Sequence, residues 1–162
     1  MRSDFSGIAA GVRDALSRVD SALVGTGVSE VIVIGSAAAL LAGADVEVAD
    51  IDLLTSVEDA IRIESAWSAW HQPGYVPGDG GRFRSRFSRY AWAGMPVEVM
   101  GGLEVAVDGH WQNVAVSRSR AVDGLRHIRV ASVTDQRALL ALFGRPKDDE
   151  RAHALLHVLA DA

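Results

Sequence analysis

The chain is predicted to fold as an α/β protein in which short buried strands interleave with amphipathic helices. Apolar residues recur every three or four positions between Phe5 and Leu23, which is the spacing of one helix face. The run VIVI at residues 31–34 is short, continuous and β-branched, as is typical of a strand buried on both faces. With 162 residues, the chain is long enough to bury its own core, so we expect one domain over residues 1–162.

The next elements follow from breaker and capping residues. Gly43 ends a helix predicted over residues 36–42, and a strand is predicted over residues 48–54. Ser56 with Asp59 resembles a capping box and opens a third helix. Residues 72–81, QPGYVPGDGG, are rich in proline and glycine, and we expect them to form a mobile loop bordering the active site.

The second half of the chain is predicted to be mostly strand and then helical. The expected strands cover residues 82–91 and 95–100, joined at Ala93-Gly94; residues 103–107 and 111–116, joined at Asp108-Gly109; and residues 126–130. Ser132 with Asp135 resembles another capping box, which opens a helix that Gly144 ends. A connector over residues 145–148 then leads to a terminal helix over residues 149–160.

Composition narrows the classes of function. Sixteen Lys and Arg residues against twenty-one Asp and Glu residues give a net charge of −5, which disfavours general nucleic-acid binding. The chain has no cysteine, so disulfide scaffolds and thiolate zinc sites are excluded. No apolar run approaches the ~18 residues of a membrane span. We therefore expect a soluble cytoplasmic protein that does not bind membranes.

Two aspartates on the second predicted strand are the strongest candidates for chemistry. Asp50 and Asp52 are two positions apart, so on a strand they point the same way, about 7 Å apart. Two such carboxylates repel each other unless a counter-charge is present, and a divalent metal ion is the usual one. The alternatives are a solvated strand end or an Asx turn, but the apolar neighbours Ile51, Leu53 and Leu54 favour a metal site.

Three more residues are candidates for the same site. Glu98 lies between two valines on a predicted strand and would share a sheet face with the aspartates if the strands pair, or would be a single exposed carboxylate if they do not. Gly35 lacks a side chain, so a phosphate could approach its backbone. Ser36 brings a hydroxyl group and the start of a helix, where N–H groups are free.

Arginines alternate with other residues on a later predicted strand. Arg82, Arg84 and Arg86 would line one face while Phe83 and Phe87 enter the core. Guanidinium groups match phosphate oxygens, so this face predicts a polyphosphate site. The alternatives are an exposed sheet face or an edge protected by charge, or a single-stranded nucleic-acid groove, which the acidic composition disfavours.

The C-terminal region carries four further polar residues of interest. His153 and His157 have the spacing of a zinc pair on a helix, but the HExxH pattern is absent, so a solvated or dimer-facing surface is favoured. Asp148 is expected to cap the last helix. Lys147 is either exposed or a partner of phosphate or carboxylate near the site.

The motifs Ile34-Gly35-Ser36, Asp50-Ile51-Asp52 and Val97-Glu98-Val99 together resemble the hallmark of the DNA polymerase beta-like nucleotidyltransferase superfamily. The segment from Gly144 to Asp148 resembles the Gly-Arg-x-Lys-Asp element of its small bacterial members, including antibiotic-modifying and abortive-infection-type enzymes. The resemblance implies a nucleotidyltransferase fold with a central mixed sheet and flanking helices. One departure is the acidic segment at residues 45–49, which precedes the aspartates and would oppose approaching phosphates.

The resemblance also implies a reaction. An acceptor hydroxyl would attack the α-phosphate of a nucleoside triphosphate such as ATP, and pyrophosphate would leave. Asp50 and Asp52 would hold two Mg²⁺ ions, and Glu98 would complete one metal site and help to take the acceptor proton. Gly35 and Ser36 would seat the terminal phosphates. Arg82, Arg84 or Arg86 would balance the charge of pyrophosphate.

A small chain leaves little room for an acceptor-binding domain. The acceptor is therefore expected to be small, to come from a partner protein, or to bind across a homodimer interface. The main alternative function is a catalytically weak interaction module with the same fold, such as one component of a toxin–antitoxin pair. The acidic residues 45–49 favour this alternative, whereas Asp50, Asp52 and Glu98 favour an enzyme.

Overall fold

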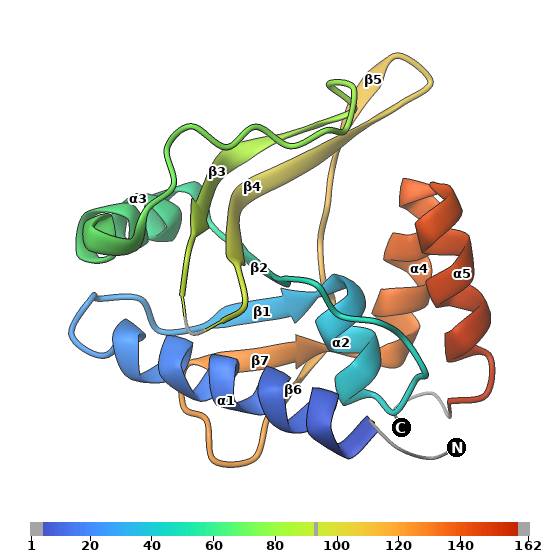
Figure 1. The fold of residues 1–162 in the computed structure, drawn as a ribbon. Helices are drawn as coiled ribbons and strands as arrows, with labels where there is room; N and C mark the ends of the chain where they lie inside the picture. Colours follow the sequence, from blue (N-terminus) through green and yellow to red (C-terminus); the bar gives the residue numbers. More distant parts are fainter. Residues whose placement is uncertain (1–4, 93, 159–162) are drawn as a thin grey trace.

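A computed structural model describes residues 5–92 and 94–158 of the chain (Figure 1). Over these residues the strands form a seven-stranded mixed sheet in the order β3-β4-β2-β1-β7-β6, with β5 paired to β4. Helices pack on both faces of this sheet, which confirms the predicted α/β fold with a central mixed sheet.

The elements alternate along the chain much as the breaker residues predict. The strands are β1 (Val31–Ile34), β2 (Ile51–Thr55), β3 (Phe83–Tyr90), β4 (Val97–Val107), β5 (His110–Asn113), β6 (Ser119–Ala121) and β7 (Ile128–Ala131). The helices are α1 (Phe5–Leu23), α2 (Gly35–Leu41), α3 (Val57–Ala66), α4 (Val133–Phe143) and α5 (Pro146–Leu155), with a short 3-10 helix η1 (Ser68–Trp70).

Two apolar clusters fill the two sides of the sheet. On one side, α1 and α3 bury residues such as Leu16 and Ile63 against Val33 and Leu53 of the central strands. On the other side, α4 buries Leu139 against the sheet together with neighbouring aliphatic side chains. In Figure 1, α1 runs beneath β1 and β7. Helices α4 and α5 lie side by side at the right of the view, and α3 lies at the left. The second side of the sheet therefore carries the C-terminal helices.

The register of the central strands determines which side chains meet. Strand β2 lies between β1, its antiparallel neighbour, and β4, its parallel neighbour. Asp52 is paired with Ile34 in one direction and with Glu98 in the other. Because side chains alternate along a strand, Ile51 enters the α1 and α3 side, whereas Asp52 points to the side of α4. The two acids thus share a face.

The helix boundaries follow local chemistry. Ser56 accepts a hydrogen bond from the Asp59 backbone N–H at 3.1 Å, and Ser132 accepts one from Asp135 at 3.1 Å, as expected of N-caps. Gly144 ends α4 in the left-handed conformation, with φ of 61°. These three boundaries were predicted correctly.

Strand β4 differs from the prediction, which divided it into two strands at residues 101 and 102. The strand is continuous because these glycines serve packing and a bulge rather than a turn. A Cβ at Gly101 would lie 2.5 Å from the Cβ of Ala60, so only glycine allows α3 to approach this closely. Gly102, with φ of 61°, accompanies a shift in the β3–β4 register.

Other boundaries in the structure differ from the predicted ones by a few residues. Strand β2 begins at Ile51 rather than at residue 48, and β6 was not predicted. Helix α5 begins at Pro146, because proline at the first helical position already has a helical φ and needs no N–H partner. Residues 159 and 160 of the predicted terminal helix, and Ala93 of the predicted hairpin turn, lie outside the described residues.

Candidate active site

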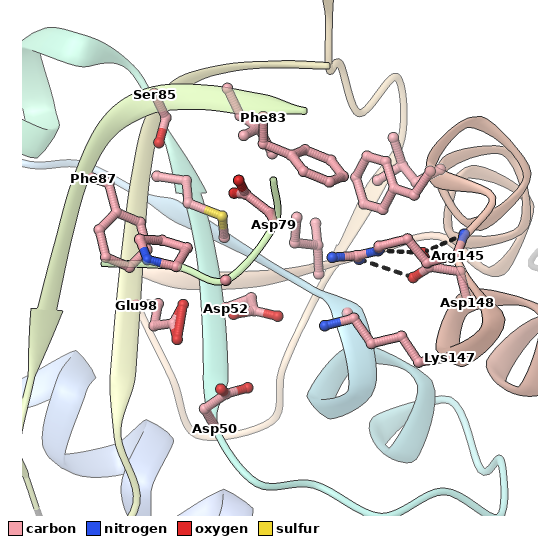
Figure 2. A pocket seen from close by; sticks show the side chains of 18 of the residues that line it. Asp50, Asp52, Asp79, Phe83, Ser85, Phe87, Glu98, Arg145, Lys147 and Asp148 are labelled. Carbon is pink, nitrogen blue, oxygen red and sulfur yellow. Dashed lines mark hydrogen bonds and ion pairs between the residues drawn. The ribbon is translucent and has the colours of Figure 1, made fainter. Parts of the chain in front are cut away.

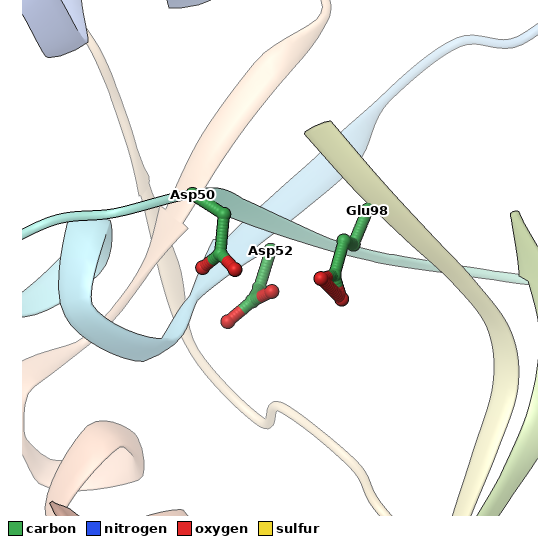
Figure 3. A group of neighbouring side chains, drawn as sticks. All are labelled: Asp50, Asp52 and Glu98. Carbon is green, nitrogen blue, oxygen red and sulfur yellow. The ribbon is translucent and has the colours of Figure 1, made fainter. Parts of the chain in front are cut away.

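Three carboxylates from two parallel strands converge at one point of the sheet. Asp50 immediately precedes β2, Asp52 lies within β2, and Glu98 is the residue of β4 paired with Asp52. One oxygen atom from each carboxylate lies within 4.8 Å of the others (Figure 3). The structure therefore brings together all three predicted metal-ligating residues. Three carboxylate oxygens this close form a donor set suited to a hard divalent cation.

The surroundings make ionisation of this cluster costly. Burial, followed by the charges of Asp50 and Glu98, raises the pKa of Asp52 from 3.8 to about 7, although Arg151 and Lys147 act in the opposite direction. Burial and Asp50 also raise the pKa of Glu98, against the lowering effect of Arg89. Without a cation, Asp52 thus holds its proton below about pH 7, and a bound cation would displace that proton.

Gly35 stands directly beside this cluster. Its φ is +71°, and a Cβ built on it would lie 2.5 Å from Oδ2 of Asp52. Glycine is required there for both reasons, because it allows the left-handed backbone and leaves space for the carboxylate. Gly35 lines the cavity described below. Ser36, only 1 % exposed, is buried in the core side of α2 and is outside the cavity's lining.

A cavity of about 550 Å³ opens over the carboxylates on the α4 side of the sheet (Figure 2). Its polar wall combines Asp50, Asp52 and Glu98 with three cationic residues, namely Arg145 just before α5 and Lys147 and Arg151 within it. Its remaining walls are largely apolar and aromatic. The lining on that side includes Phe83, Phe87, Met100, Leu103, Leu139 and Phe143. The cavity thus joins an ionic end to a largely apolar end, in which Asp79 and Ser85 lie near Phe83 and Phe87 (Figure 2).

The start of α5 is held in place by a buried aspartate. Asp148 is fully buried and accepts hydrogen bonds from the Arg145 backbone N–H at 3.1 Å and from the Arg145 Nε at 2.5 Å. Arg151 lies 3.8 Å from the same carboxylate. Asp148 therefore helps to cap α5, as expected, but from the third position of the helix, because the N-cap residue is Arg145. In Figure 2, Lys147 extends from this turn toward the carboxylates, which resolves whether it lies near the site.

The predicted arginine face is not the face that meets the carboxylates. Phe83, Ser85 and Phe87 line the cavity, as Figure 2 shows, and Arg86, which lies between Ser85 and Phe87, points to the α3 side. There, Arg86 forms an ion pair with Glu64 of α3 at 2.6 Å. Arg84 borders the cavity, but its guanidinium is bonded to Glu104 and lies 4.2 Å from the Trp111 ring.

Arg82, which precedes β3, reaches α4 rather than the α3 side. Arg82 donates to the carbonyl of Leu142 at 3.3 Å and is not among the residues lining the cavity. The phenylalanines were expected to enter the core. Phe83 packs against the buried cluster that includes Phe143, as expected, but Phe83 and Phe87 are only partly buried and also line the cavity. The alternation was correct. The position of α3 determines which side of the strand faces the site. The alternation of residues along the strand does not predict the position of α3.

Arg89 contacts the carboxylate cluster and was missed by the sequence analysis. It is paired across the strands with Glu98, and its guanidinium lies 2.8 Å from that carboxylate. It also donates to Gln72 at 3.2 Å and lies 4.0 Å from the ring of Tyr75. The signal was present, because Arg89 has the same strand parity as Phe83 and Phe87. The loop over residues 72–81 borders the cavity, as expected.

The two C-terminal histidines take no part in this site. Helix α5 ends at Leu155, so His157 lies beyond the helix that carries His153, and both side chains are exposed. They do not form a metal-ligating cluster with other described residues. The solvated reading of this pair is therefore favoured. Among the described residues, no helix is both long and apolar enough to cross a membrane.

A mixed sheet with an acidic cluster contributed by two parallel strands defines the nucleotidyltransferase fold, and the chain has this fold. A structure similar to it is the crystal structure of a "putative nucleotidyltransferase" (TM1012) from Thermotoga maritima. The two chains superpose with a TM-score of 0.66 and 25% sequence identity, over 87% of this chain and 89% of that one. The chain matches no protein-family model and no curated protein.

Proposed function

We propose that this chain is a metal-dependent nucleotidyltransferase that moves a nucleoside monophosphate from a nucleoside triphosphate to a hydroxyl group of an acceptor. The observation that carries the proposal is the convergence of Asp50, Asp52 and Glu98 within 4.8 Å, at the floor of a cavity whose ionic end also holds cationic residues. Carboxylates alone would repel a triphosphate. Carboxylates with divalent cations, facing Lys147 and Arg151, would bind it.

The cationic turn of α5 is suited to the phosphates. Lys147 and Arg151 lie close enough to Asp52 to lower its pKa, so they act on the same volume as the carboxylates. Their positive charge would oppose the charge that builds on pyrophosphate as it leaves. Gly35 would leave room for the phosphates beside Asp52. The acidic residues Asp45 and Glu47 are exposed and do not line the cavity, so they do not oppose this binding directly.

The reaction breaks one bond and forms one. The acceptor oxygen would attack the α-phosphorus atom, and the bond between that atom and the bridging oxygen of pyrophosphate would break. The acceptor proton would pass to a carboxylate, and Glu98, the residue of β4 paired with Asp52, would be placed to accept it. Mg²⁺ held by Asp50, Asp52 and Glu98 would supply charge neutralisation at the phosphate and would acidify the attacking hydroxyl group.

The decisive experiment is calorimetric titration of ATP, CTP, GTP and UTP, each with and without Mg²⁺, into wild-type protein and Asp52→Asn. The proposal expects binding that depends on the metal and is lost in the variant. Transfer would then be followed as pyrophosphate release in the presence of candidate acceptors. Triphosphate binding that ignores the metal would contradict the proposal.

The alternative is a catalytically weak module that keeps the fold and binds a protein partner, such as a toxin–antitoxin component. The exposed acidic residues before β2 favour it, because they form a charged surface outside the cavity. This alternative expects no metal-dependent triphosphate binding, together with capture of a partner by Asp52→Asn as well as by wild-type protein. The same titrations therefore separate the two functions.

A further inference from the structure

Arg89 joins one carboxylate of the acidic cluster to the loop over residues 72–81. Its guanidinium donates a hydrogen bond to Glu98 at 2.8 Å, and the two side chains are only 18 % and 11 % exposed. The same guanidinium donates to Gln72 Oε1 at 3.2 Å and lies 4.0 Å from the centre of the Tyr75 ring. One planar cation therefore contacts both a candidate metal ligand and the loop.

The middle of this loop has few other attachments. Val76, Pro77 and Gly78 make no hydrogen bond to any other part of the chain that the structure describes. A Cβ added at Gly74, Gly78 or Gly80 would meet no atom within 4 Å, so open space surrounds these positions. A segment with few hydrogen bonds and open surroundings moves at a low cost in free energy. The few side chains that hold the loop therefore determine its position.

Tyr75 is the side chain through which the middle of the loop rests on β3. Its ring stacks on Phe87 at 6.0 Å, in addition to its contact with Arg89. Tyr75 is 40 % exposed and Val76 is 80 % exposed, and both line the cavity. Asp79 of the same loop lines it as well (Figure 2). The position of the loop therefore determines where one wall of the cavity lies.

A cation bound at the acidic cluster would compete with Arg89. The guanidinium and a divalent cation are both attracted to the Glu98 carboxylate, and two positive charges this close repel each other. Arg89 balances the charge of Glu98 in the absence of a metal ion, so its ion pair with Glu98 weakens once a metal ion supplies that balance. The contacts with Gln72 and Tyr75 then lose the fixed guanidinium on which they depend.

We propose that Arg89 is a positioning residue that holds the loop over residues 72–81 in place, and that a cation bound at Glu98 releases this loop. The released loop opens the cavity, so the cation binds before the triphosphate. The inference rests on the proposed function, because it needs a divalent cation held by Asp50, Asp52 and Glu98.

The test measures how fast chymotrypsin cuts the bond after Tyr75, with and without Mg²⁺ and without nucleotide. Cleavage requires the loop to leave its position, so its rate follows the population of the open form when opening is fast. Loss of one charged hydrogen bond predicts cleavage about tenfold faster with Mg²⁺. Cleavage after Trp111, on β5 outside the cavity, is the internal reference and should not accelerate. An unchanged rate after Tyr75 in protein that binds Mg²⁺ by calorimetry would overturn the inference.

Three variants test the role of Arg89. Arg89→Met removes the anchor, so cleavage after Tyr75 should be fast without Mg²⁺ and should not respond to it. Arg89→Lys keeps a charge for Glu98 but lacks the planar fork that also reaches the loop, so its loop should be cut fast as well. Arg86→Met is the matched control, because Arg86 pairs with a carboxylate on the α3 side of the same strand, and it should behave as wild-type protein. A wild-type response to Mg²⁺ in Arg89→Met would overturn the role of Arg89.

Failure of the inference can be told apart from failure of the proposed function. If calorimetry shows no Mg²⁺ binding, the proposed function fails and the inference fails with it. If Mg²⁺ binds and the loop does not respond, only the inference fails. General loss of stability in a variant would speed cleavage after Tyr75 and after Trp111 alike, so equal acceleration at both bonds would also overturn the role of Arg89. Should Arg89→Met not fold, Arg89→Lys and the response of wild-type protein decide the question.

Discussion

A Cβ at position 35 would lie 2.5 Å from Oδ2 of Asp52, so the glycine that opens α2 and the aspartate of β2 require each other. The contact follows from the register, in which Asp52 is paired with Ile34, the residue before the glycine. The sequence predicts that Gly35 lets a phosphate approach the backbone. The structure shows that glycine is also needed there to leave space for the Asp52 carboxylate.

Gly35→Ala is expected to damage both stability and the site. The alanine would carry the strain of a positive φ, about 1–2 kcal/mol, and would also displace the Asp52 carboxylate. Gly25→Ala is the matched control, because Gly25 has a similar φ of +78° but no atom within 4 Å of an added Cβ. Urea denaturation should show a larger loss for Gly35→Ala, and calorimetry should show lost Mg²⁺-dependent triphosphate binding for that variant alone. Equal behaviour of the two variants would mean that the contact with Asp52 is unimportant.

The raised pKa of Asp52 predicts a specific pH dependence. Its carboxyl titrates near 7 in the folded protein and near 3.8 when unfolded, so between these values the folded state holds a proton that the unfolded state has released. Its stabilising contribution is therefore greatest below pH 4 and is lost as the pH rises through 7. Asparagine does not titrate, so Asp52→Asn should gain stability relative to wild-type protein, by about 1–3 kcal/mol, between pH 5 and pH 8.

Thermal or urea unfolding without metal, at pH 5 and pH 8, measures this difference. Adding Mg²⁺ at pH 8 should stabilise wild-type protein and leave Asp52→Asn nearly unchanged. Asp45→Asn, at an exposed position outside the cavity, should show no such pH effect. A large loss of stability in Asp52→Asn at pH 8 would mean that Asp52 has a structural role instead.

Two sets of cations compete for the role of phosphate ligand. Lys147 lines the cavity, whereas Arg86 is paired with Glu64 on the other side of β3. Lys147→Gln should weaken triphosphate binding more than monophosphate binding, by about 1.5–3 kcal/mol for the lost charged hydrogen bond. Arg86→Gln should leave both dissociation constants unchanged. The reverse pattern would restore the sequence-based assignment of phosphate binding to the arginines.

Two exposed tryptophans are candidates for the surface through which the predicted homodimer would form. Trp70 is 41 % exposed and stacks on Trp92 at 4.8 Å, whereas Trp67 is buried. Trp111 is 40 % exposed. Exposed aromatic side chains of this size are enriched at interfaces. We expect light scattering to give twice the 17.2 kDa chain mass, and Trp70→Ser to shift it toward the monomer. A mass that stays at one chain at all concentrations would contradict the dimer.

The acidic cluster could be predicted because its members lie in short motifs whose geometry is local. Alternation predicts that Asp50 and Asp52 point to the same side, and their carboxylates do converge, although Asp50 lies one residue before β2. The cationic wall could not be located in this way, because Lys147 reaches the site only through the packing of α5 beside α4. The prediction that the arginines of β3 line the site was wrong for the same reason. Alternation defines the two faces of the strand, but the position of α3 determines which face meets the site.

The break predicted in β4 shows a related limit. Two consecutive glycines usually indicate a turn, and nothing near Gly101 in the sequence indicates otherwise. The need for glycine comes from Ala60, forty-one positions earlier in the chain. Long-range packing thus determined each feature that local patterns could not predict.

Arg89→Met should lower the free energy of unfolding when Glu98 is charged. Arg89 is the ion-pair partner of Glu98 at 2.8 Å, and both side chains are largely buried. Its removal would leave the carboxylate unpaired, so the pKa of Glu98 should rise further and the free energy of unfolding should fall by about 1–3 kcal/mol at pH 8. The loss should become smaller as the pH falls toward 5, because more of Glu98 is then protonated and needs no counter-charge.

Arg62→Met is the matched control, because Arg62 pairs with Glu58 and Asp59 on the exposed surface of α3 and should matter less at either pH. Mg²⁺ should partly restore the stability of Arg89→Met at pH 8, since the cation replaces the missing positive charge beside Glu98. The variants would be compared by urea denaturation at both pH values, with and without Mg²⁺. If Arg89→Met and Arg62→Met lose the same stability at both pH values, Arg89 does not hold Glu98 in its ionised form, and the third carboxylate is then independent of the loop that carries Gln72 and Tyr75.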